Sequence, residues 1–85
     1  MKQTDALHLI IKERNNQVEK WGDIKHSPFE YISLIAEEVG EAARHANEIH
    51  WNGRYYNVDE DEKKRLLIGE LSQVAALCIA AMEAM

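Results

Sequence analysis

The pattern of apolar and polar positions is helical from the first residues of the chain. Apolar side chains recur every three or four positions near the start, at Leu7, Ile10, Ile11, Val18 and Trp21. Residues at this spacing lie on one face of an α-helix, so the pattern predicts a first helix from Thr4 to Lys20. Gly22 follows, and a glycine just after the last periodic residue is typical of a helix end.

The start of a second helix is marked by three neighbouring residues. Ser27 suits the N-cap, Pro28 suits the first helical position, and Glu30 stands three residues after the cap, where it completes a capping box. We expect this helix to run to about His50. The Asn-Gly pair at positions 52–53 should break it.

A third helix start follows a short connection. Asp59 with Glu62 is another capping-box candidate, and helical spacing continues from there toward the C-terminus. The segment from Trp51 to Val58 is then a connection. Because no segment alternates between apolar and polar residues as a strand would, the sequence predicts one all-α domain over residues 1–85, with three main helices.

The second helix carries carboxylates beside its apolar face. Its apolar stripe is expected to face the core and consists of Ile32, Ile35, Ala36, Val39, Ala43 and Ala46. Glu37 lies on the far side, where a solvated glutamate is ordinary. Glu38 and Glu41 instead lie side by side on the flank of the predicted buried face, in a row that continues to His45.

The third helix repeats this arrangement, because Glu70 and Gln73 have the same spacing and lie beside an apolar arc. Carboxylates gathered near a desolvated face repel one another and raise one another's pKa. A hard divalent cation relieves that repulsion, and Mg²⁺ prefers oxygen ligands and commonly bridges substrate phosphates. The spacing therefore fits a magnesium site between two helices. Solvated glutamates on a helix surface are the alternative interpretation.

Length and cysteine content limit how so small a domain can be stabilised. A chain of 85 residues buries only ~60% of its unfolded surface, so a disulfide, a metal or oligomerisation usually adds stability. Cys78 is the single cysteine, which excludes a disulfide within the chain. From Val74 to Met82 the helix is apolar all round, more than two other helices can cover. The sequence therefore predicts a homo-oligomer, either a dimer or a tetramer.

The charge balance disfavours other classes of partner. A net charge of −5 is unsuited to nucleic acid or an anionic membrane, which also disfavours a DNA-binding or antitoxin-like helical module. The apolar segment at positions 7–11 is short for a signal peptide, and we expect no membrane span of ~20 apolar residues. Together with the cysteine content, these features favour a cytoplasmic protein.

Two motifs and the segment before them resemble a known family. Residues 37–41 are EEVGE, residues 70–73 are ELSQ, and residues 13–22 are ERNNQVEKWG, followed by His26. This combination resembles the MazG-like nucleotide pyrophosphohydrolases of the all-α NTP pyrophosphatase superfamily, which carry EExxE on one helix and ExxD on the next. The first motif matches fully, and Gln73 stands where the second has aspartate.

The resemblance implies a helical bundle completed by oligomerisation. It also implies hydrolysis of a nucleoside triphosphate to the monophosphate and pyrophosphate, in a house-cleaning or other nucleotide-pool role, with Mg²⁺ or Mn²⁺. Glu38, Glu41 and Glu70 would be metal ligands, and Gln73 would offer only a neutral amide oxygen. Glu37, like Glu41, would serve catalysis, as a further ligand or by orienting or deprotonating the attacking water.

The first helix would bind the substrate. Arg14, Gln17 and Trp21 share one face of it. By family position Trp21 would stack on the nucleobase above Gln17, and Lys20 is placed to meet a phosphate. Packing is the alternative role for Trp21, and solvation is the alternative for Lys20. The alternative to an enzyme is a non-catalytic helical oligomer with a structural or regulatory role, which Gln73 keeps open.

Overall fold

The computed structural model describes residues 1–22, 24–51 and 58–85. It contains three α-helices, α1 (Gln3–Trp21), α2 (Pro28–His50) and α3 (Glu60–Glu83). No strand is found in these described ranges, which confirms the all-α prediction. The predicted first helix agrees with α1 to within one residue at each end, and the predicted end of the second helix at His50 is confirmed. The expected break at positions 52–53 lies outside the described residues.

Local hydrogen bonds explain where the first two helices end and begin. Gly22 has φ 76°, a left-handed conformation that favours glycine, and its N–H donates to the Val18 carbonyl at 2.7 Å. Ser27 Oγ accepts from the Glu30 N–H at 3.2 Å, and Glu30 Oε1 accepts from the Ser27 N–H at 3.0 Å. This reciprocal pair confirms the predicted capping box. The hydrogen bonds from Ser27, first its backbone N–H, lower the pKa of Glu30.

The start of α3 is capped by a single side chain. Asp59 Oδ1 accepts a hydrogen bond from the Glu62 N–H at 2.8 Å, which confirms Asp59 as the N-cap. Only this half of the predicted capping box is found, and Glu62 Oε2 accepts instead from Arg65 Nη1 at 3.0 Å. By length and composition alone, α3 is apolar enough to cross a membrane, contrary to the expectation from the sequence that no segment would reach that length. The core helix of a bundle has the same properties, because it must be apolar on several sides.

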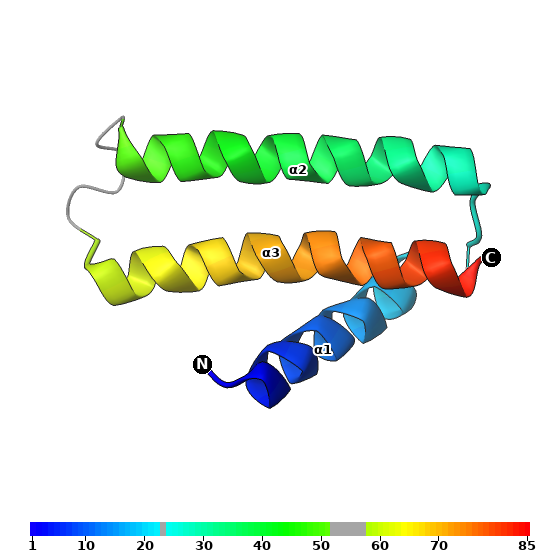
Figure 1. Ribbon diagram of the computed structural model, residues 1–85, viewed down its shortest axis with the longest axis horizontal. Coiled ribbons are helices and arrows are strands. Elements are labelled where there is room, and N and C mark those ends of the chain that lie inside the picture. The colour runs from blue at the N-terminus through cyan, green and yellow to red at the C-terminus, as the bar shows by residue number, and fades with distance from the viewer. Residues whose placement is uncertain (23, 52–57) are drawn as a thin grey trace.

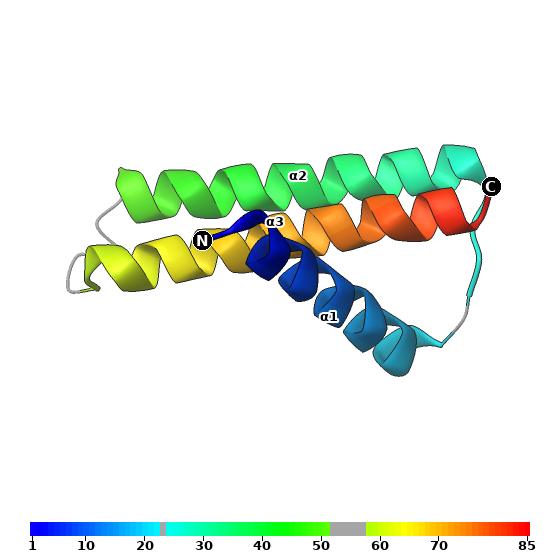
Figure 2. The same cartoon turned by 60° about the horizontal axis from the view of Figure 1, so that its bottom comes forward.

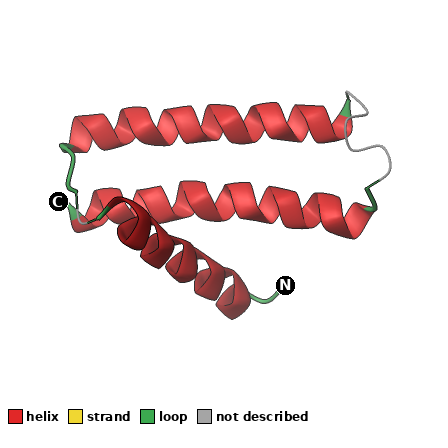
Figure 3. Ribbon diagram, turned by 180° about the vertical axis from the view of Figure 1, so that it is seen from behind, coloured by secondary structure: helices red, strands yellow, loops and turns green. Residues whose placement is uncertain are grey.

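The three helices do not form a closed bundle. α2 and α3 lie side by side and run antiparallel, whereas α1 crosses α3 obliquely (Figure 1). The same arrangement is seen after rotation and from behind (Figures 2 and 3). α3 packs against both other helices, but in the described part of the chain α1 does not pack against α2. α3 is therefore the central helix, and a space remains between α1 and α2.

The core of the single chain is small. Tyr31 of α2 packs with Ala80 and Ala81 of α3, and partly buried Leu34, Ile35 and Ala84 surround them. The Tyr31 hydroxyl donates to the Ile24 carbonyl at 3.4 Å, which ties the connection before α2 to this cluster. None of the larger side chains in the described ranges is fully buried. Cys78 is also only partly buried.

The prediction for the core face of α2 is confirmed only in part, because Ile35 packs against the core cluster and Ala46 is half-buried, while the other four residues of the expected stripe are exposed. Ile32 and Val39 of the expected stripe are 62% and 49% exposed. α3 packs instead along the neighbouring flank, where Tyr31 and Ile49 are buried and Glu38 is half-buried. The reason is tertiary, because periodicity identifies an apolar stripe but not the element that covers it. We call the exposed residues Ile32, Ala36, Val39 and Ala43 the outer face of α2.

Candidate functional site

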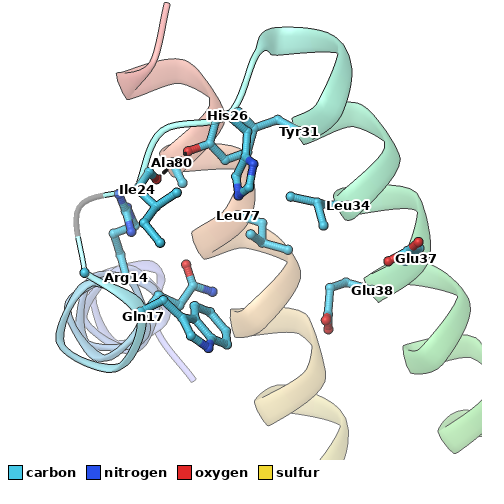
Figure 4. Close-up of a pocket in the computed structure, with 12 residues that line it drawn as sticks. Arg14, Gln17, Ile24, His26, Tyr31, Leu34, Glu37, Glu38, Leu77 and Ala80 are labelled. Carbon is cyan, nitrogen blue, oxygen red and sulfur yellow. Dashed lines mark hydrogen bonds between the residues drawn. The ribbon is translucent and has the colours of Figure 1, made fainter.

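A groove lies between α1 and α2, with α3 as its floor. It contains a cavity of about 420 Å³, whose walls come from both helices, from α3 and from the connection before α2. Most of these walls are apolar, and we call this cavity the apolar pocket (Figure 4). It is lined by Arg14, Gln17, Trp21, Gly22, Ile24, His26, Tyr31, Leu34, Glu37, Glu38, Leu77 and Ala80.

A second cavity of about 250 Å³ adjoins the first and is more polar. We call it the polar pocket. It is lined by Glu13, Asn16, Gln17, Lys20, Trp21, Glu38, Glu41, Gln73 and Leu77. The two cavities are neighbours because they share four lining residues, Gln17, Trp21, Glu38 and Leu77. The structure thus brings Lys20 on α1, Glu41 on α2 and Gln73 on α3 to a single cavity.

The carboxylates of the site interact electrostatically. Burial raises the pKa of Glu38, and the negative charges of Glu41, Glu70 and Glu37 raise it further. Glu38 projects from α2 toward the groove (Figure 4). Glu37 is exposed, as its position on the helix predicted, yet it lines the apolar pocket beside Glu38. Three of the four predicted glutamates therefore act electrostatically on the fourth, the half-buried Glu38.

Glu70 has a partner that the sequence analysis did not assign. His45 Nδ1 forms a hydrogen bond with Glu70 Oε1, and the Glu70 side chain is 17% exposed. This bond links α2 to α3. His45 continues the row of Glu38 and Glu41, and that position was the available signal for this pairing. Glu70 lines neither pocket.

The donor set at this site fits a hard cation in its chemistry. Carboxylate oxygens dominate it, and an amide oxygen is available at Gln73. Burial raises the pKa of Glu38 most, and the repulsion from neighbouring carboxylates, which raises it further, is what a cation would relieve. Within the described residues, however, no three His, Cys, Asp or Glu side chains converge on one point as they stand. Glu70 would have to exchange His45 for an ion to join such a set.

The α1 residues predicted to bind substrate differ in their surroundings. Gln17 is 5% exposed, and its Nε2 donates to the Gln73 backbone carbonyl at 3.4 Å. Trp21 is 55% exposed, and Lys20 Nζ lies 5.1 Å from the centroid of its ring. Arg14 Nε donates to Glu83 Oε1 at 2.9 Å, which fixes the guanidinium at one wall of the apolar pocket. All four of these α1 residues line the groove between α1 and α2.

Comparisons with known proteins do not identify a family for this chain. No family model matches the chain, and neither the curated proteins nor the solved structures give a match. The resemblance to MazG-like enzymes thus remains a prediction from the motifs.

Proposed function

We propose that this protein is a Mg²⁺-dependent nucleotide pyrophosphohydrolase, with Mn²⁺ as a substitute ion. The observation that carries the proposal is the position of Glu38. Its side chain lies where an apolar pocket meets a polar one, and burial, followed by the charges of three further glutamates, raises its pKa. A nucleotide has the same division, with an apolar ring at one end and a charged chain that needs a cation at the other.

The reaction assigns a task to each side of the site. The base would occupy the apolar pocket, and the triphosphate would lie in the polar pocket near Lys20. Water would attack the α-phosphorus and break its bond to the oxygen that bridges the α- and β-phosphates, which releases monophosphate and pyrophosphate. Glu37 or Glu41 would orient the water and accept its proton. Mg²⁺ bound by Glu38, Glu41 and Glu70 would offset the charge of the phosphates.

Two observations favour a second candidate, a non-catalytic helical oligomer. Gln73 lines the polar pocket where an acid would be the stronger ligand, and Glu70 is already hydrogen-bonded to His45. In that case the acids would connect and position helices without turning over a nucleotide, in a structural or regulatory role.

Product analysis separates the two candidates. The protein is incubated with each of the four deoxynucleoside triphosphates, in Mg²⁺ and in chelator, and the products are resolved by ion-exchange chromatography. The proposal expects equal amounts of monophosphate and pyrophosphate in Mg²⁺ and neither product in chelator. Release of diphosphate and orthophosphate would contradict the reaction, and absence of turnover with every substrate would favour the non-catalytic candidate.

We further propose that the working unit is a homo-oligomer with twofold symmetry. The chain exposes 6491 Å², whereas a folded monomer of its mass exposes about 5,200 Å². The excess exceeds the roughly 800 Å² that one partner buries in a standard interface. The outer face of α2 is a suitable contact surface, because a surface that packs on its own symmetry copy can remain free of charge. Such a nucleotide hydrolase would work in the cytoplasm.

A further inference from the structure

The outer face of α2 is the middle part of a longer apolar seam. Phe29 precedes it and is 85% exposed, more than any other large apolar side chain in the described ranges. Ala46 follows it and is half-buried. The six positions are separated by alternating steps of three and four residues, which is the heptad spacing of a helix that packs along a second helix. We call them the heptad seam, and they are Phe29, Ile32, Ala36, Val39, Ala43 and Ala46.

Side-chain size changes along the heptad seam. The first two positions carry an aromatic ring and a branched chain, whereas the last two carry alanine. In a parallel pair of identical helices each residue meets its own copy, so two rings would meet at one end and alanines at the other. The rings would hold the helices apart and leave a void between the alanines, which closely packed proteins avoid. The uneven sizes therefore disfavour a parallel pair.

An antiparallel pair removes this mismatch. In one register Ala36 lies opposite the partner's Val39. The next layer then joins Ile32 to the partner's Ala43, and the outermost layer joins the first residue of the seam to the last. Every layer therefore pairs one large side chain with one alanine. Twofold symmetry repeats each layer on the other side of the centre, so all six positions of both copies are matched.

Gly40 is a separate observation that points to the same surface. Glycine inside a helix is less stable than alanine at the same position. A Cβ built on Gly40 would meet no atom of the described residues within 4 Å, so they give no packing reason for a glycine. Gly40 lies at the edge of the heptad seam, next to Val39. In the antiparallel register it lies beside the partner's Ser33, where a missing side chain lets two backbones approach closely.

A second copy of the chain is the partner that fits this surface. The heptad seam contains no charged side chain, and its large end complements its small end. A surface that complements itself in reverse is what a twofold interface requires. The chain also exposes more surface than a folded monomer of its mass, and the excess is larger than one partner buries in a standard interface.

We infer that two copies of this chain pair through antiparallel α2 helices, so that each large side chain of the heptad seam packs on an alanine of the partner. The twofold axis then passes α2 between Ala36 and Val39. This inference rests on the homo-oligomer of the proposed function. It goes beyond that proposal because it specifies the direction and the register of the paired helices.

An exchange of side-chain size across one layer tests the register. Ile32→Ala opens a cavity in the seam and Ala43→Ile overpacks it, and symmetry places each change twice in the dimer. Each single variant should weaken association by about 10-fold or more. In the double variant Ile32→Ala, Ala43→Ile an alanine again meets an isoleucine, so most of this loss should be recovered. Sedimentation equilibrium over a dilution series gives the dissociation constants.

The matched control has the same composition and places the isoleucine in the wrong layer. In Ile32→Ala, Ala36→Ile two alanines meet in one layer, and an isoleucine meets a valine in the next. This variant should associate as weakly as the single variants. If both double variants associate equally well, or if Ile32→Ala, Ala43→Ile is weaker than both single variants, the register is wrong and the inference fails.

Cross-linking tests the direction of the helices without a change in packing volume across every layer. Two chains of different mass are mixed in a Cys78→Ala background, one with Ile32→Cys and the other with Ala43→Cys. A short thiol cross-linker should join the Ile32→Cys chain to the Ala43→Cys chain and should not join two Ile32→Cys chains. Mass spectrometry identifies the products. Efficient joining of two Ile32→Cys chains would show a parallel pair and overturn the inference.

Failure of this inference and failure of the proposed function give different results, because these experiments contain neither nucleotide nor metal. Turnover of triphosphates by a protein whose Ile32→Cys chains join one another would refute the antiparallel seam and leave the pyrophosphohydrolase intact. The expected recovery and cross-links, without any turnover, would establish the antiparallel seam in a non-catalytic oligomer.

Discussion

The two faces of α2 have opposite chemistry and opposite surroundings. The face against α3 contains half-buried Glu38 and His45 between buried Tyr31 and Ile49. The outer face contains mainly small and branched apolar side chains, yet Val39 is 49% exposed. In an isolated monomer one expects the reverse, since apolar surface belongs in the core and charge in water.

The difference shows that the two faces meet different requirements. Carboxylates packed against α3 are costly unless a ligand or a hydrogen bond compensates them, and the Glu70–His45 bond supplies part of that compensation. An apolar face left in water is costly unless a second chain covers it. The inner face therefore points to a ligand, and the outer face points to a second copy.

The largest effect should follow from a charge on the outer face. Val39→Arg would bury an unpaired cation in the proposed interface, at a cost of roughly 3 kcal/mol or more. We expect the oligomer to dissociate and the melting temperature to fall. Light scattering after size-exclusion chromatography, at micromolar protein, gives the mass of the particle.

The matched control for this variant is Ile11→Arg. Ile11 is 55% exposed on α1, comparable with Val39, but lies on a different helix. The Ile11→Arg variant should therefore leave the oligomer intact. A wild-type protein that is already monomeric and stable would remove the reason for a partner on the outer face.

Helix ends could be predicted from the sequence because caps are local. Ser27 bonds the N–H three residues on, Gly22 adopts a left-handed conformation, and Asp59 caps α3, each through contacts within one turn. The inward face of α2 could not be predicted, because it depends on where α3 packs. The apolar residues have the same helical spacing whether the helix that covers them belongs to the same chain or to a second chain.

The second prediction concerns catalysis at the inner face. Glu38→Gln keeps the shape of the side chain but removes its charge, so kcat/KM for the preferred triphosphate should fall by about 100-fold or more. Glu19→Gln, at an exposed position of α1, should have wild-type activity. Steady-state release of pyrophosphate is the measurement. Equal activity of both variants would mean that the carboxylate of Glu38 takes no part in the reaction.

Several of the residues predicted for the candidate site lie together in the structure, whereas Glu70 lines neither pocket. Helical spacing and the motif resemblance together identified Gln17, Lys20, Glu38, Glu41 and Gln73, which all line the polar pocket. Spacing works here because residues three or four apart share a helix face whatever packs on it. The bond from His45 to Glu70 was not predicted, because it depends on the register between α2 and α3, which no local pattern determines.

A smaller effect is expected when the acid missing from the second motif is restored. Gln73→Asp adds a negative charge to the pocket that Glu38 and Glu41 already line. Repulsion should lower the melting temperature in chelator, and a more tightly bound ion should raise it above wild type in saturating Mg²⁺. In each case the free energy of unfolding should change by about 1 kcal/mol. Asn15→Asp, exposed on α1, is the control. An unchanged melting temperature of Gln73→Asp in both conditions would place residue 73 away from any ion.

The smallest expected effect is a pH dependence of stability. The pKa of Glu38 is raised in the folded protein, so between its ordinary value and the raised one the folded state holds more protons than the unfolded state. The free energy of unfolding must then fall as the pH rises through that interval. Its total contribution should stay below about 1 kcal/mol, because the carboxylate is only half-buried.

Comparing variants isolates this contribution from the other acids. In chelator, Glu38→Gln should melt at the wild-type temperature at acidic pH and above it once the pH has passed through the interval. Glu30→Gln should behave in the opposite way, because hydrogen bonds from Ser27 lower the pKa of Glu30 and their stabilisation is lost as the pH falls. Its destabilisation should thus be present at neutral pH and vanish in acid. If the difference in melting temperature between Glu38→Gln and the wild type is the same from acidic to neutral pH, the pKa of Glu38 is not raised by burial or by Glu41 and Glu70. The inner face of α2 would then carry ordinary solvated acids, with no charge repulsion for a cation between α2 and α3 to relieve.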